Sequence, residues 1–219
     1  MERKPEPELM DAVDQARAYS QADFSDPNSL FLALFQRHFP DLVPRHILDL
    51  GCGPADICIR FAETYTTAEV TGVDGAEAML AFAREAIEKS DSKNRIRLVC
   101  DRIQDVDTGK FDALISNSLL HHLAAPDDIW RAIQRLASTG AAVMVMDLMR
   151  PPTETAAHSI VETYASDQDV VLRRDFFHSL CAAFTVDEVR TQLHRNGLAG
   201  LSVENVSDRH LLVYGRMEN

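Results

Sequence analysis

Two glycines and an aspartate that could bind a nucleoside lie at the end of one apolar run. Residues 47–50 read Ile-Leu-Asp-Leu, which is typical of a buried strand, and Gly51 and Gly53 form a turn before a helical pattern. Glycine lacks a Cβ atom, so it can adopt positive φ and let a ligand approach the backbone. The helix that follows would direct its unpaired N–H groups into the same space. Asp49 adds a negative charge there, which favours a ligand with a cationic or hydroxylated end.

A second acid follows at the distance expected of a ribose-binding carboxylate. Residues 70–74 form another predicted strand that ends in Asp74, about 20 residues beyond the glycine turn. Asp56 stands where the third glycine of a dinucleotide-binding fingerprint would be. Together the two acids indicate a nucleoside, while the missing glycine and the charge of Asp49 favour adenosine without a pyrophosphate.

Four motifs follow one another in a fixed order. They are Asp-Leu-Gly-Cys-Gly at 49–53, Val-Asp at 73–74, Val-Cys-Asp at 99–101 and Phe-Asp-Ala-Leu-Ile-Ser-Asn at 111–117. Their order and spacing resemble those of class I S-adenosylmethionine-dependent methyltransferases. The resemblance implies an α/β fold with helices on both faces of a mostly parallel sheet and an N-terminal helical lid. Ala55 stands where many members have a third glycine, which we expect to be tolerated if φ at this position is negative.

The predicted strands number seven and give the sheet an antiparallel edge strand. They cover residues 47–50, 69–74, 96–100, 111–116, 141–147, 201–206 and 210–215. Right-handed crossovers through helices make most of this sheet parallel. We expect a disordered tail over residues 1–8 and a single methyltransferase domain over residues 9–219. Its parts would be a helical lid (9–45), a cofactor-binding core (46–150), a substrate-pocket insertion (151–184) and a final helix with a β-hairpin (185–219).

The resemblance implies S-adenosyl-L-methionine as cofactor and S-adenosyl-L-homocysteine as product. The residues that would bind the cofactor are Asp49, Gly51, Cys52, Gly53, Asp74, Gly75, Met79, Asp101, Arg102, Ile103 and Asn117. In this family Asp101 would accept a hydrogen bond from the adenine amino group, and the backbone of Arg102 or Ile103 would meet the ring edge. The alternative is that Asp101 only caps the following turn.

His122 and Tyr19 are the candidate catalytic residues. Either His121 or His122 could take a proton from an acceptor, because imidazole is half-ionised near neutral pH. Members of the resembling family often carry a His-Leu pair here that serves cofactor contact and packing. Tyr19 lies in the predicted lid, where it could equally pack with Phe24 onto the core. We expect no metal site, because two neighbouring histidines do not easily face one ion and no third ligand is evident.

Arg150, Tyr164 and Arg174 are the candidate substrate-binding residues. A guanidinium at a strand end can pair with a carboxylate through two hydrogen bonds, and Arg150 follows the fifth predicted strand. Its alternative is a salt bridge to an acid of the lid. Tyr164 and Arg174 lie in the insertion, which would suit a small, partly apolar acid. A charged helical face would explain Arg173 and Arg174 equally well.

Composition excludes several classes of partner. With 219 residues, 46% of them apolar, the chain can form one sizeable domain. Its 34 acidic and 22 basic residues give a net charge of −12, which would repel a nucleic-acid backbone. Residues 116–119 read Ser-Asn-Ser-Leu, unlike the corresponding elements of enzymes that methylate adenine or cytosine bases. We therefore expect a small-molecule substrate and no nucleic acid.

The cysteines and the amino-terminal residues indicate the compartment. The four cysteines lack paired metal spacing and are expected to be reduced thiols of a cytosolic protein. Residues 1–7 are charged and contain proline, unlike a signal peptide. No apolar run approaches the roughly 20 residues of a membrane span. The sequence thus predicts a cytoplasmic protein without a membrane partner, as a monomer or homodimer.

The function that these patterns favour is transfer of a methyl group to a small molecule by in-line displacement. In such a reaction the enzyme contributes mainly alignment and exclusion of water. Three alternatives stay open. A nicotinamide-dependent oxidoreductase is disfavoured by Asp49 and the missing third glycine. An enzyme that uses S-adenosylmethionine without methylating, or a protein that only senses it, would share the nucleoside site.

Overall fold

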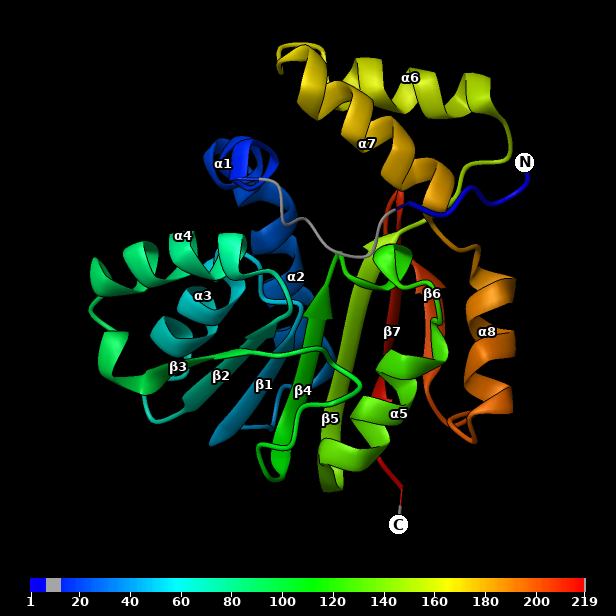
Figure 1. The fold of residues 1–219 in the computed structure, drawn as a ribbon. Coiled ribbons are helices and arrows are strands. Elements are labelled where there is room, and N and C mark those ends of the chain that lie inside the picture. Colours follow the sequence, from blue (N-terminus) through cyan, green and yellow to red (C-terminus); the bar gives the residue numbers. More distant parts are fainter. Residues whose placement is uncertain (7–12, 219) are drawn as a thin grey trace.

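A seven-stranded sheet forms the middle of three layers (Figure 1). The computed structural model describes residues 1–6 and 13–218. The strands are β1 (His46–Leu50), β2 (Glu69–Asp74), β3 (Ile96–Cys100), β4 (Phe111–Asn117), β5 (Ala137–Leu148), β6 (Ser202–Asn205) and β7 (His210–Arg216). Their order is β3-β2-β1-β4-β5-β7-β6, and only β7 runs against the others. The predicted sheet is confirmed, with its antiparallel strand one position inside the edge.

Helices cover both faces of the sheet. They are α1 (Val13–Gln21), α2 (Ser25–His38), α3 (Asp56–Thr64), α4 (Glu77–Glu88), α5 (Asp127–Leu136), α6 (Glu154–Ala165), α7 (Val170–Ala182) and α8 (Val186–Arg195), with short 3₁₀ turns η1 (Lys93–Arg95) and η2 (Leu120–His122). Successive side chains of a strand point to opposite faces. Accordingly Ile47 of β1 packs with α2, α3 and α4, whereas Leu48 and Leu50 pack with α5 and α8. Because both faces are buried, β1 reads as a continuous apolar run apart from Asp49.

The strand order places a crevice between β1 and β4. From β1 the chain crosses over to β2 and then β3 on one side, and afterwards returns to β4 on the other side. Ligands of open α/β sheets bind at such a reversal, outside the carboxyl ends of the strands. Asp49 pairs in register with Gly72 of β2 and Ile115 of β4. It therefore lies on the strand that borders this crevice.

Two further elements lie at the carboxyl ends of the strands. Helices α6 and α7 pack side by side above the sheet, through a cluster that includes Leu148, Val161 and Leu180. Helix α1 packs on α4 through Ala16 and Met79. The span of the expected helical lid (9–45) thus contains the helices α1 and α2, and its residues 9–12 lie outside the described residues.

The amino-terminal residues are ordered where a disordered tail was expected. Arg3 Nε donates a hydrogen bond to the Ala182 carbonyl at 2.5 Å, and the Lys4 amide donates to the Cys181 carbonyl at 3.0 Å. These contacts hold residues 1–6 along the end of α7, close to α6 in Figure 1. Charged side chains suggested a solvated tail, but here they find partners on a helix far away in sequence. Residues 7 and 8 of the predicted tail lie outside the described residues.

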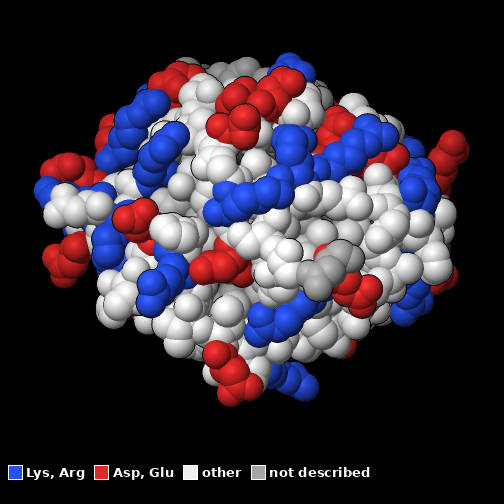
Figure 2. Space-filling model, turned by 90° about the horizontal axis from the view of Figure 1, so that it is seen from below, with Lys and Arg blue, Asp and Glu red and all other residues white. Residues whose placement is uncertain are grey.

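The face at the amino ends of the parallel strands carries charges of both signs. Figure 2 shows lysine and arginine side chains next to aspartate and glutamate across this face. A nucleic-acid backbone is attracted by a continuous basic surface, which this face does not present. None of the helices in the described part of the chain combines the length and apolar character that a bilayer-spanning helix requires.

Candidate active site

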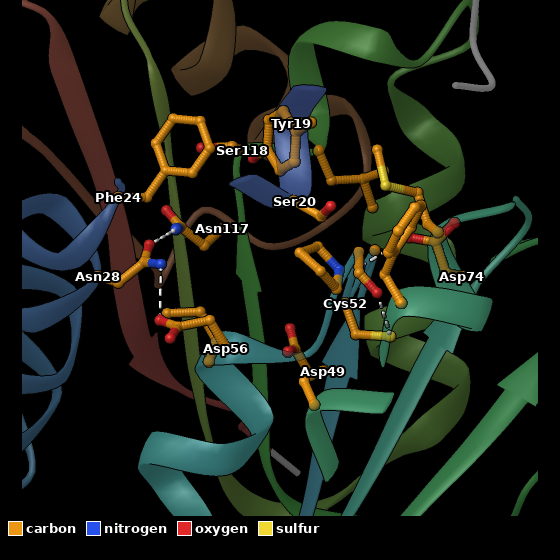
Figure 3. A pocket seen from close by; sticks show the side chains of 18 of the residues that line it. Tyr19, Ser20, Phe24, Asn28, Asp49, Cys52, Asp56, Asp74, Asn117 and Ser118 are labelled. Carbon is orange, nitrogen blue, oxygen red and sulfur yellow. Dashed lines mark hydrogen bonds between the residues drawn. The ribbon is translucent and has the colours of Figure 1, made fainter. Parts of the chain in front are cut away.

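A cavity of about 570 Å³ lies where the carboxyl ends of β1, β2 and β4 meet α1 (Figure 3). This volume is in the usual range of small-molecule sites, roughly 300–1,000 Å³. The sequence-predicted residues that line it are Tyr19, Asp49, Gly51, Cys52, Gly53, Asp74, Gly75, Met79, Arg102, Ile103, Asn117 and His122. The structure therefore brings almost all predicted cofactor residues to one place.

Asp101 is the exception among the predicted cofactor residues. It is not among the described residues that line the cavity, although its neighbours Arg102 and Ile103 are. Its Oδ1 accepts a hydrogen bond from the Arg102 amide at 2.8 Å. This contact is the one that the alternative predicts, in which Asp101 holds the turn after β3, and the adenine contact stays a prediction.

The glycine turn after β1 needs residues without side chains. Gly51 has φ +74°, and a Cβ atom there would come within 2.8 Å of the Leu119 side chain. Gly53 has φ +50° and meets nothing within 4 Å of its missing Cβ. The turn is therefore closed on the side of Leu119 and open at Gly53, where a ligand can approach the backbone.

Ala55 ends this turn in a left-handed conformation. Its φ of +68° and ψ of +19° do not meet the condition of a negative φ under which alanine was expected to be tolerated. The first turn of α3 follows immediately, and glycine would adopt this conformation without the steric cost of a Cβ atom. For alanine this conformation costs about 1–2 kcal/mol. The fold keeps it because Ala55 is fully buried in the core beneath α2 and α3.

Asp74 joins the end of β2 to the glycine turn. Its Oδ2 accepts a hydrogen bond from the Gly53 amide at 2.9 Å, and its Oδ1 accepts from the Ala76 amide at 2.8 Å. Each carboxylate oxygen can accept more than one hydrogen bond. The two amides therefore fix the carboxylate at the cavity wall and leave it able to bind hydroxyl groups.

Asp49 is a buried acid on the floor of the same cavity. Only 1% of its surface is exposed, and the Cys58 thiol donates to its Oδ2 at 3.2 Å. Burial raises the pKa of Asp49 to about 7; the hydrogen bond from Cys58 opposes this rise, and the negative charge of Asp74 adds to it. A nearby cation favours the ionised form of such an acid. Asp49 is thus suited to bind a positively charged group.

A chain of polar side chains crosses the cavity from α2 to β4. Asn117 Nδ2 donates to Asn28 Oδ1 at 3.0 Å, and Asn28 Nδ2 donates to Asp56 Oδ2 at 2.8 Å (Figure 3). Asn117 Oδ1 is buried and has no hydrogen-bond partner among the described residues. A buried acceptor of this kind is normally satisfied by a ligand or water. Sequence reasoning missed Asn28, although a polar residue on the apolar face of a helix was a usable signal.

Tyr19 and Phe24 cover the cavity on the side opposite Asp49 (Figure 3). Their ring centroids are 4.6 Å apart. Burial raises the pKa of Tyr19 to about 12, and the negative charge of Asp147 and Asp74 adds to the rise. Tyr19 therefore keeps its proton at neutral pH, where it can donate a hydrogen bond but not act as a base. The packing role weighed for this residue is also present.

Of the two neighbouring histidines, His122 lines the cavity and His121 lies behind it. His121 is buried, with its Nδ1 2.5 Å from Asp147 Oδ1. Burial lowers the pKa of His121, but the Asp147 carboxylate outweighs this effect and the net shift is upward. His122 Nδ1 is 3.3 Å from Oε1 of Glu6, a residue that no local sequence pattern connects to it. His122 is therefore the histidine that could contact an acceptor.

Arg150 does not reach the cavity. Its Nη2 lies 2.6 Å from Glu188 Oε1, and its Nη1 donates to the Ala183 carbonyl at 2.9 Å. Only 8% of the side chain is exposed. The guanidinium is thus engaged by the end of α7 and the start of α8, which corrects its predicted role toward a substrate. The salt bridge weighed as its alternative is present, with an acid of α8 instead of the lid.

The other two predicted substrate residues also point elsewhere. The Tyr164 hydroxyl donates to Asp208 at 2.9 Å, and the Arg209 guanidinium lies 3.3 Å from the centre of its ring. Arg174 pairs with Asp175 at 2.9 Å on the exposed side of α7. Neither is among the described residues of the cavity lining. The sequence placed both in the correct insertion but could not show which way each helix faces.

Comparison with known proteins agrees with this geometry. The sequence pattern of the family described as "Methyltransferase domain" matches residues 44–197. The chain belongs to this family. The match includes the four ordered motifs and confirms the predicted resemblance.

Relatives of this methyltransferase domain are distant and longer. A malonyl-[acyl-carrier protein] O-methyltransferase of Legionella pneumophila is 30% identical over 162 residues, which cover 71% of this chain and 56% of the relative. A ubiquinone biosynthesis O-methyltransferase of Alkalilimnicola ehrlichii is 32% identical over 128 residues, covering 58% and 51%. The chain thus spans about half the length of the curated relatives it matches.

Solved structures share the fold of the methyltransferase domain. The plantazolicin methyltransferase BpumL, in complex with a pentazolic desmethylPZN analogue and S-adenosylhomocysteine, has a TM-score of 0.73 at 14% identity, covering 94% of this chain and 91% of that one. An S-adenosylmethionine-dependent methyltransferase from Aquifex aeolicus has a TM-score of 0.66 at 16% identity, covering 92% and 97%. At such identities the likeness concerns the fold alone.

Proposed function

We propose that this methyltransferase domain binds S-adenosylmethionine in the cavity and transfers its methyl group to a small-molecule acceptor. The observation that carries the proposal is the placement of Asp49 and Asp74. The two acids end neighbouring strands and line one cavity, with the Gly51 to Gly53 turn between them. An adenosine that carries a cationic amino-acid tail presents hydroxyl groups and a positive charge, which these two carboxylates complement.

Further features of the cavity fit this cofactor. Asp74 would accept hydrogen bonds from the ribose hydroxyl groups, and Asp49 would pair with the amino group of the tail. The apolar side chains of Met79 and Ile103 also line the cavity, and they would pack on the adenine ring. Asn117 Oδ1, a buried acceptor with no partner among the described residues, would accept a hydrogen bond from the ligand.

The chain would promote the reaction by alignment and enclosure. S-adenosylmethionine, when bound, supplies a methyl group on a positively charged sulfur. Tyr19 and Phe24 cover the cavity and exclude water, and Tyr19 can donate a hydrogen bond that orients an acceptor. Positioning of two reactants contributes up to roughly 7–11 kcal/mol of barrier reduction in favourable cases. His122, which lines the cavity, is available to take a proton from an acceptor that needs to lose one.

Several observations support a small acceptor. The helical lid leaves a cavity of about 570 Å³ for cofactor and acceptor together. The net charge of −12 disfavours a polyanionic substrate. The two relatives named above are O-methyltransferases, which supports an oxygen atom as the nucleophile.

A labelling experiment tests this function. The protein would be incubated with S-adenosylmethionine carrying an isotopically labelled methyl group and with a metabolite extract. We expect the label in one small molecule and S-adenosylhomocysteine as the second product. Binding of the cofactor without transfer of label would instead indicate a sensor. A product that contains another part of the cofactor would indicate a transferase of a different group.

A further inference from the structure

Three side chains of the metal-binding type meet beside the cavity. Oε1 of Glu6 lies 3.6 Å from His121 Nε2 and 3.3 Å from His122 Nδ1. The three ligand atoms all lie within 4.8 Å of one another. Glu6 comes from the ordered amino-terminal segment, whereas both histidines belong to η2. The fold therefore assembles a group of two imidazoles and one carboxylate from distant parts of the chain.

The spacing of these atoms suits a common metal centre. Zn²⁺ binds histidine nitrogen and carboxylate oxygen at about 2.0–2.2 Å, so the ligands of a tetrahedral site lie roughly 3.3 Å apart. Two of the observed separations, 3.3 and 3.6 Å, are close to this value. The expectation that neighbouring histidines do not face one ion is wrong here, because one nitrogen of each imidazole lies within 4.8 Å of the other and of a carboxylate oxygen of Glu6. Glu6 provides the third ligand that the sequence did not reveal.

Hydrogen bonds behind two of the three ligands, His121 and Glu6, are of the kind that metal sites use. His121 Nδ1 lies 2.5 Å from Asp147 Oδ1, so the opposite ring nitrogen, Nε2, faces Glu6. The Ser179 hydroxyl donates to Glu6 Oε1 at 2.9 Å. Metal-binding histidines usually donate their second N–H to a carboxylate or carbonyl, and metal-binding carboxylates are themselves hydrogen-bonded. Such partners fix the ring orientation and increase the basicity of the ligand.

The segment that carries Glu6 is held firmly against η2. Nη2 of Arg3 donates to the carbonyls of His121 at 2.9 Å and Leu123 at 3.3 Å. The side chains of Glu6, His121 and His122 are 14%, 3% and 15% exposed. An ordinary surface ion pair would not enclose its groups in this way.

We propose that Glu6, His121 and His122 bind a divalent transition-metal ion such as Zn²⁺. Imidazole and carboxylate ligands suit Zn²⁺ and chemically similar ions better than Ca²⁺ or Mg²⁺, which prefer sites made of oxygen ligands. Three protein ligands leave a coordination position for water or a substrate atom.

The site also has a consequence for the proposed methyl transfer, and this part rests on that function. His122 lines the cavity, so the ion would lie at its wall. A bound ion lowers the pKa of a coordinated hydroxyl group and so generates an oxygen nucleophile at neutral pH. An acceptor with an ionisable O–H group would then need no separate base.

Titration of the 219-residue chain without an affinity tag tests the metal site. After treatment with a chelator, ZnCl₂ would be titrated by calorimetry and CoCl₂ by its visible absorption bands. We expect one ion per chain in both titrations. Glu6→Gln should lose most of this affinity, and Asp147→Asn should weaken it by about 10–100-fold. His46→Gln and Glu69→Gln change an exposed histidine and an exposed glutamate at the amino ends of β1 and β2, and both variants should bind as the wild type does.

Two results would overturn the proposal. One is the failure of the wild-type protein to bind either ion in a 1:1 ratio, and the other is unchanged affinity in Glu6→Gln. Circular dichroism would confirm that each variant is folded. If Asp147→Asn does not fold, the affinity of Glu6→Gln alone tests the proposal. Titration with S-adenosylhomocysteine in parallel separates this outcome from a failure of the proposed function, because cofactor binding does not require the ion.

Discussion

The Gly53 amide donates a hydrogen bond to Oδ2 of Asp74 at 2.9 Å, which ties the turn after β1 to the end of β2. One carboxylate thereby shapes the glycine turn and faces the cavity. A second acid, Asp49, lies on the neighbouring strand with a pKa raised by burial to about 7. The pair explains why a sheet with so few polar core residues keeps two acids at the tips of adjacent strands. Each prediction below tests one part of this arrangement or of its surroundings.

Asp49 should make folding stability depend on pH. Its pKa is about 7 in the folded protein and near 3.8 when exposed, so between these values the folded state holds a proton that the unfolded state has lost. Stability contributed by this group is therefore greatest at low pH, and it falls by at most about 1.4 kcal/mol per pH unit up to pH 7. Urea denaturation of the wild type and Asp49→Asn at pH 5 and pH 7 measures the difference. Parallel behaviour of the two proteins would contradict the buried, protonated acid.

The affinity for the cofactor should also depend on the protonation of Asp49, but it should increase with pH whereas folding stability decreases. If the amino group of the ligand pairs with ionised Asp49, protons compete with the ligand below the folded pKa. The affinity for S-adenosylhomocysteine should then increase from pH 6 to pH 8, by up to about tenfold per unit at the acidic end. In Asp49→Asn the affinity should be lower and nearly independent of pH over this interval. Calorimetric titrations at three pH values would show whether the slope disappears with the carboxylate.

Ala55 should tolerate glycine and reject β-branched residues. Glycine removes a left-handed alanine that costs about 1–2 kcal/mol, but it also loses a buried methyl group and gains unfolded-state entropy. We expect Ala55→Gly to stay within about 1 kcal/mol of the wild type and Ala55→Val to be less stable by about 2 kcal/mol or more. Chemical denaturation distinguishes these outcomes. A well-tolerated valine would mean that the turn has a negative φ at this position after all.

Arg150 should matter for stability and not for binding. Its guanidinium is buried against Glu188 and the Ala183 carbonyl, so Arg150→Met leaves these groups without their partner. A loss of about 1–3 kcal/mol in the free energy of unfolding is expected, with unchanged affinity for S-adenosylhomocysteine. Arg174→Met, at an exposed ion pair, serves as the control and should change stability by less than about 0.5 kcal/mol. A stable Arg150→Met variant with weakened acceptor binding would restore the substrate role predicted from the sequence.

The parts of the fold that could be predicted are those with a local signal. Short apolar runs between turn signals mark strands, so β1, β2 and β3 are predicted to within one residue of their bounds. The start of α8 carries a local signal as well, because Thr185 and Glu188 have the spacing of a capping box and both of its hydrogen bonds are present. Most of the predicted cofactor residues lie at or just after the carboxyl ends of strands. The strand order brings these ends to one cavity.

Features that depend on distant contacts had no such signal. Glu6 reaches His122 across more than half of the chain, and its charged neighbours suggested a solvated tail. The pairing of Arg150 with Glu188 depends on how α7 leads into α8, which no periodicity reveals. The backbone conformation of Ala55 could not be predicted either, because the residue type alanine gives no indication of a positive φ.

The most direct test of the account is the affinity of Asp74→Ala for S-adenosylhomocysteine, with Asp112→Ala as control. Asp112 also accepts backbone hydrogen bonds, from Arg45 and His46, but it lies at the amino end of β4, away from the cavity. Both variants should lose stability, whereas only Asp74→Ala should lose affinity, by at least about tenfold. Calorimetric titration of the two folded variants beside the wild type gives the answer. Wild-type protein that binds no S-adenosylhomocysteine, or Asp74→Ala with full affinity, would contradict the proposed cofactor site.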